Sequence, residues 1–90
     1  MKDFENSDQA IDRLRATLIN KIPEQSIRES QHYSDHDEYA LALEMLLCGA
    51  HQSKIIMDDE QKYILKYLSS VINIIEYIDP EYWSYFKELG

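Results

Sequence analysis

The side chains with metal-binding potential are gathered in the middle of the chain. They are His32, Asp35, His36, Asp37, Cys48 and His51. Two histidines four residues apart share a coordination sphere when they stand on one continuous helix. A helix break is expected at Ser34 and Asp35, between His32 and His36. We therefore expect surface histidines at a helix junction, and neither a metal site nor a cofactor.

The sequence also has few features of an enzyme. It contains no Gly-rich phosphate loop, no serine in a nucleophile turn and no thiol with an identifiable base. With two glycines in 90 residues, the chain has little capacity for a deep cleft. We predict no catalytic residues, although a pocket lined by convergent polar groups would revive the enzyme interpretation.

Residues 35–47, an acidic stretch followed by an apolar run, form the centre of the chain. At about 100° per residue, one side of this predicted helix is a core stripe. The stripe consists of Tyr39, Ala42, Leu43, Leu46, Leu47 and Ala50. Carboxylates alternate with apolar groups on the opposite side, along Asp37, Leu41, Glu44 and Cys48. A second face of this kind is expected to meet another surface.

Eight residues are candidates for contact with a protein partner. Aromatic side chains beside carboxylates are typical of tight interfaces, in which acids meet the Arg and Lys of the partner. If the acids converge, they would steer a cationic partner in a salt-sensitive way, and carboxylates can stand in for phosphates in a basic groove. The candidates are Asp35, Asp37, Glu38, Leu41, Glu44, Asp58, Asp59 and Glu60.

Two helices are expected before this stretch. The apolar spacing between residues 7 and 22 predicts a first helix, with Ser7 as N-cap and Pro23 as the stop. Arg15 is expected on the solvated face of this helix. Pro23 then favours the first turn of a second, shorter helix that ends at about Tyr33.

The central helix should be capped by Asp35 and end at about Cys48, where Gly49 is a C-terminal signal. The Ile-Ile-Met segment 55–57 is expected to pack under the core. Acids 58–60 then begin a helix whose apolar arc continues to Ile78. Asp79 and Pro80 begin a short last helix. Its inward side chains are expected to be Tyr82, Trp83, Phe86 and Leu89.

These elements predict an all-α fold, a compact bundle of four to five helices in a single domain, residues 1–90. The formal net charge is −8, from 17 acids and nine bases, which argues against direct nucleic-acid binding. A single cysteine excludes an internal disulfide. The acidic N-terminus resembles no signal peptide, and no stretch is long and apolar enough to cross a membrane. We expect a cytoplasmic protein.

Residues 36–46, His-Asp-Glu-Tyr-Ala-Leu-Ala-Leu-Glu-Met-Leu, resemble the small α-helical immunity proteins of bacterial polymorphic and contact-dependent toxin systems, particularly the MafI-type group. The segment Asp79–Trp83 is similar to the aromatic closing segment of that group. The group has Gly at the helix start, where this sequence has Asp37 and Ala40. The resemblance implies a cytoplasmic protein that binds and blocks a cognate toxin domain, commonly a nuclease.

The predicted function is therefore that of an immunity protein. It would neutralise a basic nuclease toxin domain, with an RNase as the first candidate, by covering the active site or substrate groove. The alternative is a non-catalytic module that mediates protein–protein interaction. It would be a homodimer through the face of Leu41 and Cys48, or a regulatory subunit of a larger complex. Free in solution, the chain is expected to be a monomer or a weak homodimer.

Overall fold

The computed structural model describes residues 4–87, which form helices and connections without a strand. The α-helices are α1 (Ser7–Leu18), α2 (Glu24–Asp35), α3 (Tyr39–Gln52), α4 (Asp59–Val71) and the single-turn α5 (Ile74–Tyr77). A 3-10 helix, η1 (Pro80–Phe86), follows α5. This arrangement confirms the predicted all-α bundle.

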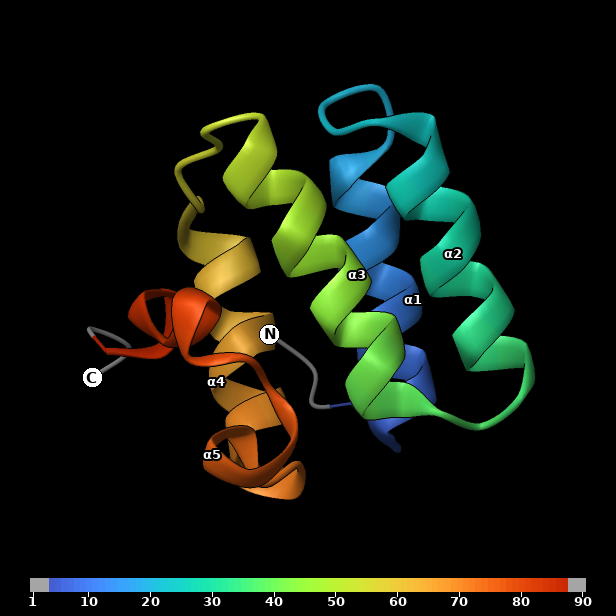
Figure 1. The fold of residues 1–90 in the computed structure, drawn as a ribbon. Coiled ribbons are helices and arrows are strands. Elements are labelled where there is room, and N and C mark those ends of the chain that lie inside the picture. The colour runs from blue at the N-terminus through green and yellow to red at the C-terminus, as the bar shows by residue number, and fades with distance from the viewer. Residues whose placement is uncertain (1–3, 88–90) are drawn as a thin grey trace.

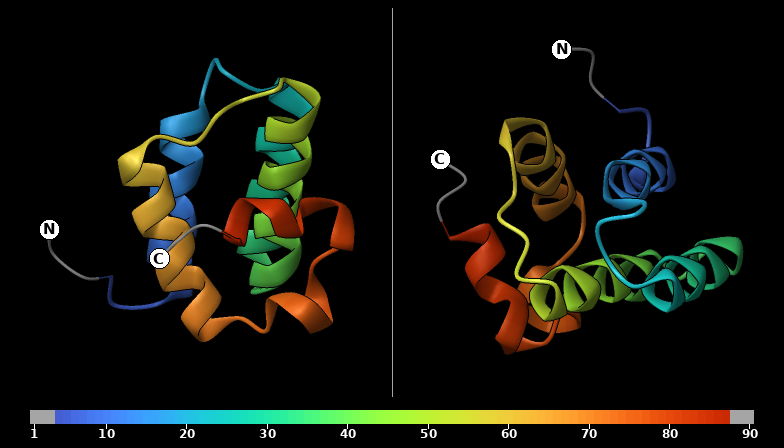
Figure 2. Two further views of the ribbon diagram at one scale, coloured as in Figure 1. Left: turned by 90° about the vertical axis from the view of Figure 1, so that its left-hand side faces the viewer. Right: turned by 90° about the horizontal axis from the view of Figure 1, so that it is seen from above.

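Helices α1 to α4 run up and down in turn, and the core lies between α1, α3 and α4 (Figures 1 and 2). Helix α2 covers the outer side of α3, while α5 and η1 pack against α3 and η1 also packs against α4. The largest fully buried apolar side chains are Ile11, Leu14, Leu18, Leu43, Leu46, Leu47, Ile64, Leu65 and Leu68. Burial of the predicted α3 stripe from Ala42 to Ala50 is confirmed, while Tyr39 is only partly buried.

Polar side chains cap several of the helix N-termini. Asp58 accepts a hydrogen bond from the N–H of Gln61, whose side chain bonds back, so α4 begins with a capping box. Asp79 caps η1, as predicted. The cap of α1 is Asn6, so the prediction of Ser7 was wrong by one residue. Asp35 does not cap α3, because it is the last residue of α2.

The helix ends were predicted least well. Helix α1 ends at Leu18, four residues before the predicted end, and the next turn has Asn20 at φ 69°. Helices α2 and α3 end in Schellman motifs with Asp37 (φ 60°) and Lys54 (φ 54°) in the left-handed conformation that glycine usually supplies. The helix stops therefore lie at residues other than glycine.

Gly49 lies inside α3 and does not end it, contrary to the prediction. A Cβ atom at this position would lie 2.8 Å from the Cβ of Ser26 and 2.9 Å from Cδ1 of Ile22. The missing side chain thus allows α2 to approach α3 closely, which explains a glycine within a helix.

The helix predicted to run from residue 58 to Ile78 is interrupted at Ile72 and Asn73. The Asn73 side chain accepts a hydrogen bond from the N–H of Glu76 and thereby begins α5. In the connection between α3 and α4, Met57 is buried as predicted, whereas Ile56 is 90% exposed. The break turns part of the predicted apolar arc outward.

The last element places its aromatic side chains at different depths. Tyr82 is buried, while Trp83 is half-buried and donates a 2.8 Å hydrogen bond from Nε1 to the carbonyl of Ile78. Leu89, expected to face inward, lies outside the described residues.

Arg15 of α1 is 5% exposed, so the prediction that it lies on the solvated face was wrong. Its side chain forms hydrogen bonds with Asp12, Ser30, Gln31 and Ser34.

Candidate partner-binding surface

The predicted contact residues do not form one cluster. Asp35, Asp37 and Glu38 lie at the α2–α3 connection, next to the N-terminus of α3, whereas residues 58–60 begin α4, which the chain reaches after the C-terminus of α3 (Figure 1). Helix α3 has 14 residues, which corresponds to a length of about 21 Å. The structure therefore separates the acids into two groups.

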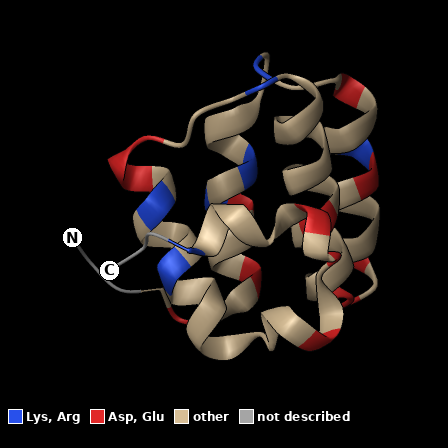
Figure 3. Ribbon diagram, turned by 60° about the vertical axis from the view of Figure 1, so that its left-hand side comes forward, with Lys and Arg blue, Asp and Glu red and all other residues tan. Residues whose placement is uncertain are grey.

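The group at residues 58–60 is compensated by neighbouring cations. The Glu60 carboxylate forms a 2.8 Å ion pair with Arg13 of α1. The lysines of α4 follow the acids along the same helix (Figure 3). Asp58 is committed to the helix cap. This group has less unbalanced negative charge to offer a partner than the group at the α2–α3 connection.

The middle of the second α3 face is covered by the C-terminal segment of the same chain. The Glu44 carboxylate accepts a 2.7 Å hydrogen bond from the backbone N–H of Asp79. Further along, a hydrogen bond with the Cys48 thiol, together with burial, raises the pKa of the Tyr82 hydroxyl. Only the end of this face, at Leu41, remains open.

That open end forms part of a concave surface that we term the acidic hollow. Its volume is about 430 Å³. It joins the start of α1 and the α2–α3 connection to the α4–α5 break. The lining residues are Ser7, Asp37, Glu38, Tyr39, Ala40, Leu41, Val71, Ile72, Asn73 and Tyr77. The hollow thus includes three predicted contacts, Asp37, Glu38 and Leu41, and no Lys or Arg is among its described lining residues.

Negative charge at the acidic hollow affects Tyr39. The Tyr39 hydroxyl donates a 2.9 Å hydrogen bond to the Asp37 carboxylate. This hydrogen bond, then partial desolvation and the charges of Asp37, Asp8 and Asp12, raises the pKa of Tyr39. Asp8 and Asp12 belong to α1 and were not predicted as part of this surface. Their contribution depends on the packing of α1 beside α3, which the sequence pattern does not reveal.

The backbone conformation of Asp37 favours glycine over aspartate. It follows the C-cap of α2 with φ 60°, a conformation that costs a non-glycine residue about 1 kcal/mol. Its charge lies between the negative end of the α2 dipole, which disfavours a carboxylate by about 0.3–1 kcal/mol, and the N-terminus of α3, which favours one. Residues that break local rules in this way occur characteristically at functional sites.

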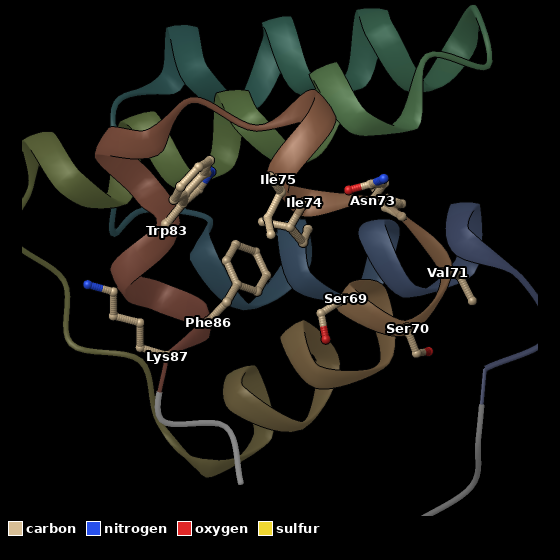
Figure 4. A pocket seen from close by; sticks show the side chains of 10 residues that line it. Ser69, Ser70, Val71, Asn73, Ile74, Ile75, Trp83, Phe86 and Lys87 are labelled. Atoms are coloured by element: carbon tan, nitrogen blue, oxygen red, sulfur yellow. The ribbon is translucent and has the colours of Figure 1, made fainter.

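Apolar side chains extend the acidic hollow outward. Leu41, Val71 and Tyr77 are 36%, 51% and 58% exposed. A second hollow of about 610 Å³ shares residues 71–73 with the first and contains Trp83 and Phe86 (Figure 4). Prediction missed this surface because it treated residues 58–78 as one helix. The available signal was Asn73, a frequent N-cap residue inside the apolar run.

The described part of the chain offers neither a metal-binding cluster nor a membrane-spanning helix. Residues 4–87 contain no group of three His, Cys, Asp or Glu side chains arranged to hold a metal ion. The rings of His32 and His36 lie 4.5 Å apart between centroids, and Nδ1 of His36 lies 2.9 Å from the His32 carbonyl oxygen. Within the same range, no helix has the length and apolar character needed to span a membrane.

The function must be inferred from the chain's own geometry and charge. Comparisons with known protein families, curated proteins and solved structures gave no match to this chain.

Proposed function

We propose that this chain is an immunity protein. In the cytoplasm it binds a cognate toxin domain, a basic nuclease with an RNase as the first candidate, and blocks access to the active site or substrate groove. Binding centres on the acidic hollow, where Asp37 and Glu38 meet basic groups and Leu41, Val71 and Tyr77 supply apolar contact area.

The observation that carries this proposal is the position of Asp37. A glycine or asparagine would suit the left-handed turn after α2 better, and either would remove a negative charge from the helix C-terminus. A carboxylate is found instead, and it lines a concave surface together with apolar side chains. A carboxylate kept in a left-handed turn beside apolar surface suits a cationic partner.

The overall charge supports the same kind of partner. A net charge of −8 attracts a basic domain over distances of about a Debye length and repels nucleic acid. The exposed acids of the hollow accelerate association, while the exposed aromatic and aliphatic side chains stabilise the bound complex. Covering the substrate path is sufficient for inhibition, so contact with the catalytic residues of the toxin is not required.

The test is binding to, and inhibition of, purified basic nuclease toxin domains, measured by calorimetry and RNA cleavage. The Asp37→Asn/Glu38→Gln variant should bind at least about tenfold more weakly and with a smaller salt dependence. The matched control, Glu24→Gln/Asp59→Asn, removes the same two charges outside the hollow and should stay within about twofold of wild type. Equal losses in both variants would exclude the acidic hollow as the binding face, and failure to inhibit any basic nuclease would reject the function.

The alternative function is that of a helical homodimer or regulatory subunit, and the exposed apolar side chains support it. The predicted face of Leu41 and Cys48 is interrupted at Glu44 by the contact with Asp79. A dimer would therefore use the surface around Ile75, which is 75% exposed. Sedimentation velocity over a wide concentration range distinguishes the two. A tight dimer that Ile75→Ser dissociates, with Ile56→Ser as the exposed control, would favour this alternative.

A further inference from the structure

We infer that the acidic hollow receives an arginine side chain of the partner, beside an apolar residue, and this inference rests on the function proposed above. It specifies which basic group the partner provides. Three properties of the hollow lead to arginine: its apolar lining, its paired acids and its exposed tyrosine ring.

The apolar and the acidic lining of the hollow require different chemistry from one ligand. Leu41, Val71 and Ile72 provide apolar surface, while Asp37 and Glu38 are exposed carboxylates. A side chain with a long hydrocarbon stem and a terminal cation satisfies both, because the stem packs on apolar groups while the charge reaches the acids. Arginine and lysine both have this form.

Tyr77 distinguishes between these two cations. Its ring lines the hollow, is 58% exposed and, within residues 4–87, packs against no other aromatic ring. A guanidinium group stacks on an aromatic face and is weakly hydrated, whereas an ammonium group is strongly hydrated and does not stack. An exposed ring beside two acids therefore selects arginine.

The carboxylates have the acceptor capacity that a guanidinium group needs. One Asp37 oxygen accepts the 2.9 Å hydrogen bond from Tyr39, which orients the carboxylate and leaves the second oxygen for the partner. Glu38 follows directly in the chain and lines the same hollow. Five N–H donors in a planar fork can contact two neighbouring carboxylates at once, which a single ammonium group does less well.

A second copy of this chain is a poorer source of the arginine. The chain has three arginines. Arg13 is paired with Glu60, and Arg15 is buried among hydrogen-bond partners. Only Arg28 is left to serve another copy. The volume of about 430 Å³ leaves room for a neighbouring apolar side chain over Val71, as a continuous segment of a protein partner would supply.

The test uses the isotope-labelled full chain and two peptides, acetyl-Leu-Arg-Leu-amide and its lysine twin, titrated by NMR. The arginine peptide should shift the amides of Leu41, Val71 and Tyr77 and bind at least about threefold more tightly than the lysine peptide. Tyr77→Leu should abolish the preference, and Asp37→Asn should weaken both peptides. Equal binding of the two peptides, or shifts confined to other helices, would overturn the inference.

This experiment is independent of the proposed function. Toxin binding that depends on Asp37, without arginine preference in the peptides, would overturn the arginine inference and leave the function standing. Arginine preference in the peptides without inhibition of any nuclease would reject the proposed function and leave the arginine site standing. If the three amides shift on raising the protein concentration alone, and a Arg28→Lys change removes that shift, the occupant is a second copy and the partner assignment is wrong.

Discussion

The Glu44 carboxylate accepts a 2.7 Å hydrogen bond from the backbone N–H of Asp79, 35 residues further along the chain. This contact ties the connection between α5 and η1 to the middle of α3. Glu44 was predicted to contact a partner, but its carboxylate already has a role within the fold. The acid therefore contributes to the position of the walls around both hollows.

Replacing Glu44 by Ala should lower the free energy of unfolding by about 1 kcal/mol, because the hydrogen bond is charge-assisted but partly exposed. Glu44→Gln retains a carbonyl acceptor and should lose less than half as much. Urea unfolding measures the difference, and amide exchange at Asp79 should be faster only in the Ala variant. Equal losses in the two variants would show that the charge, and not the hydrogen bond, matters.

Asp37 and Lys54 provide a matched pair for backbone strain, since both follow helix ends at positive φ. Lys54→Gly should raise the free energy of unfolding by about 1 kcal/mol by relieving the left-handed conformation. Asp37→Ala should lower it by a similar amount, about 1 kcal/mol, because a β-carbon remains and the side-chain acceptor is lost.

Asp37→Asn should be stabilising by up to about 1 kcal/mol, since the amide tolerates positive φ and removes the charge from the C-terminus of α2, although the N-terminus of α3 loses a favourable charge. The same variant should weaken partner binding, so stability and affinity move in opposite directions. Thermal unfolding and calorimetry measure the two quantities. A destabilised Asp37→Asn variant would show that the carboxylate is structural, which would contradict its functional assignment.

Gly49→Ala should destabilise the protein by about 1–3 kcal/mol, even though Ala is the better helix former. The new Cβ would lie 2.8 Å from the Cβ of Ser26 on α2. A Ser26→Gly/Gly49→Ala double variant removes that contact and should recover part of the loss despite the helix penalty of glycine. Urea midpoints of the single and double variants test this. If the effects of the two substitutions simply add in the double variant, the close approach of α2 to α3 is not the cause of the lost stability.

Stability should fall at alkaline pH through Tyr39. Its pKa is raised above 10.0 because the neutral hydroxyl donates to Asp37 and because nearby acids disfavour a phenolate. The fold thus favours the neutral form. The stabilisation is complete below the unfolded pKa of about 10 and is lost as the pH rises through the folded value. Tyr39→Phe should unfold with a flatter pH dependence between about pH 9 and 11.

The Asp37→Asn variant is the control for this pH effect. An amide oxygen still accepts the tyrosine proton but carries no charge, so the pKa of Tyr39 should move back towards its ordinary value. Phenolate absorbance, taken as the difference between each protein and its Tyr39→Phe derivative, isolates this residue from the other tyrosines. A pKa that is the same in wild type and in Asp37→Asn would show that the charge of Asp37 does not contribute to the shift.

Local features were predictable because they depend on neighbours in the chain. The periodicity of α3 correctly placed Ala42, Leu43 and Leu46 in the core, and the caps at Asp58 and Asp79 were identified from residue type and position. Helix stops at Asn20, Asp37 and Lys54 were missed. Any of these residue types also occurs within helices, so the backbone conformation is not evident from composition.

The candidate site was predictable only in part. Asp37, Glu38 and Leu41 were identified because a carboxylate-rich second face on α3 required a contact. Val71 was missed because it belongs to an apolar arc that predicts a continuous buried helix, and Tyr77 lies outside that arc. The helix breaks at Ile72 and Asn73, where the Asn73 side chain begins α5, and Val71 and Tyr77 on either side of the break are exposed.

The sequence by itself determined the helical class, the main core stripe and the negative charge, because periodicity, capping chemistry and charge are properties of neighbouring residues. Only the tertiary structure decided that Arg15 is buried, that Gly49 is a contact point between α2 and α3, and that Glu44 binds Asp79. It also brought Asp37 beside residues of α1, α4 and α5. Those contacts join segments far apart in the chain, and their energies depend on how whole helices pack.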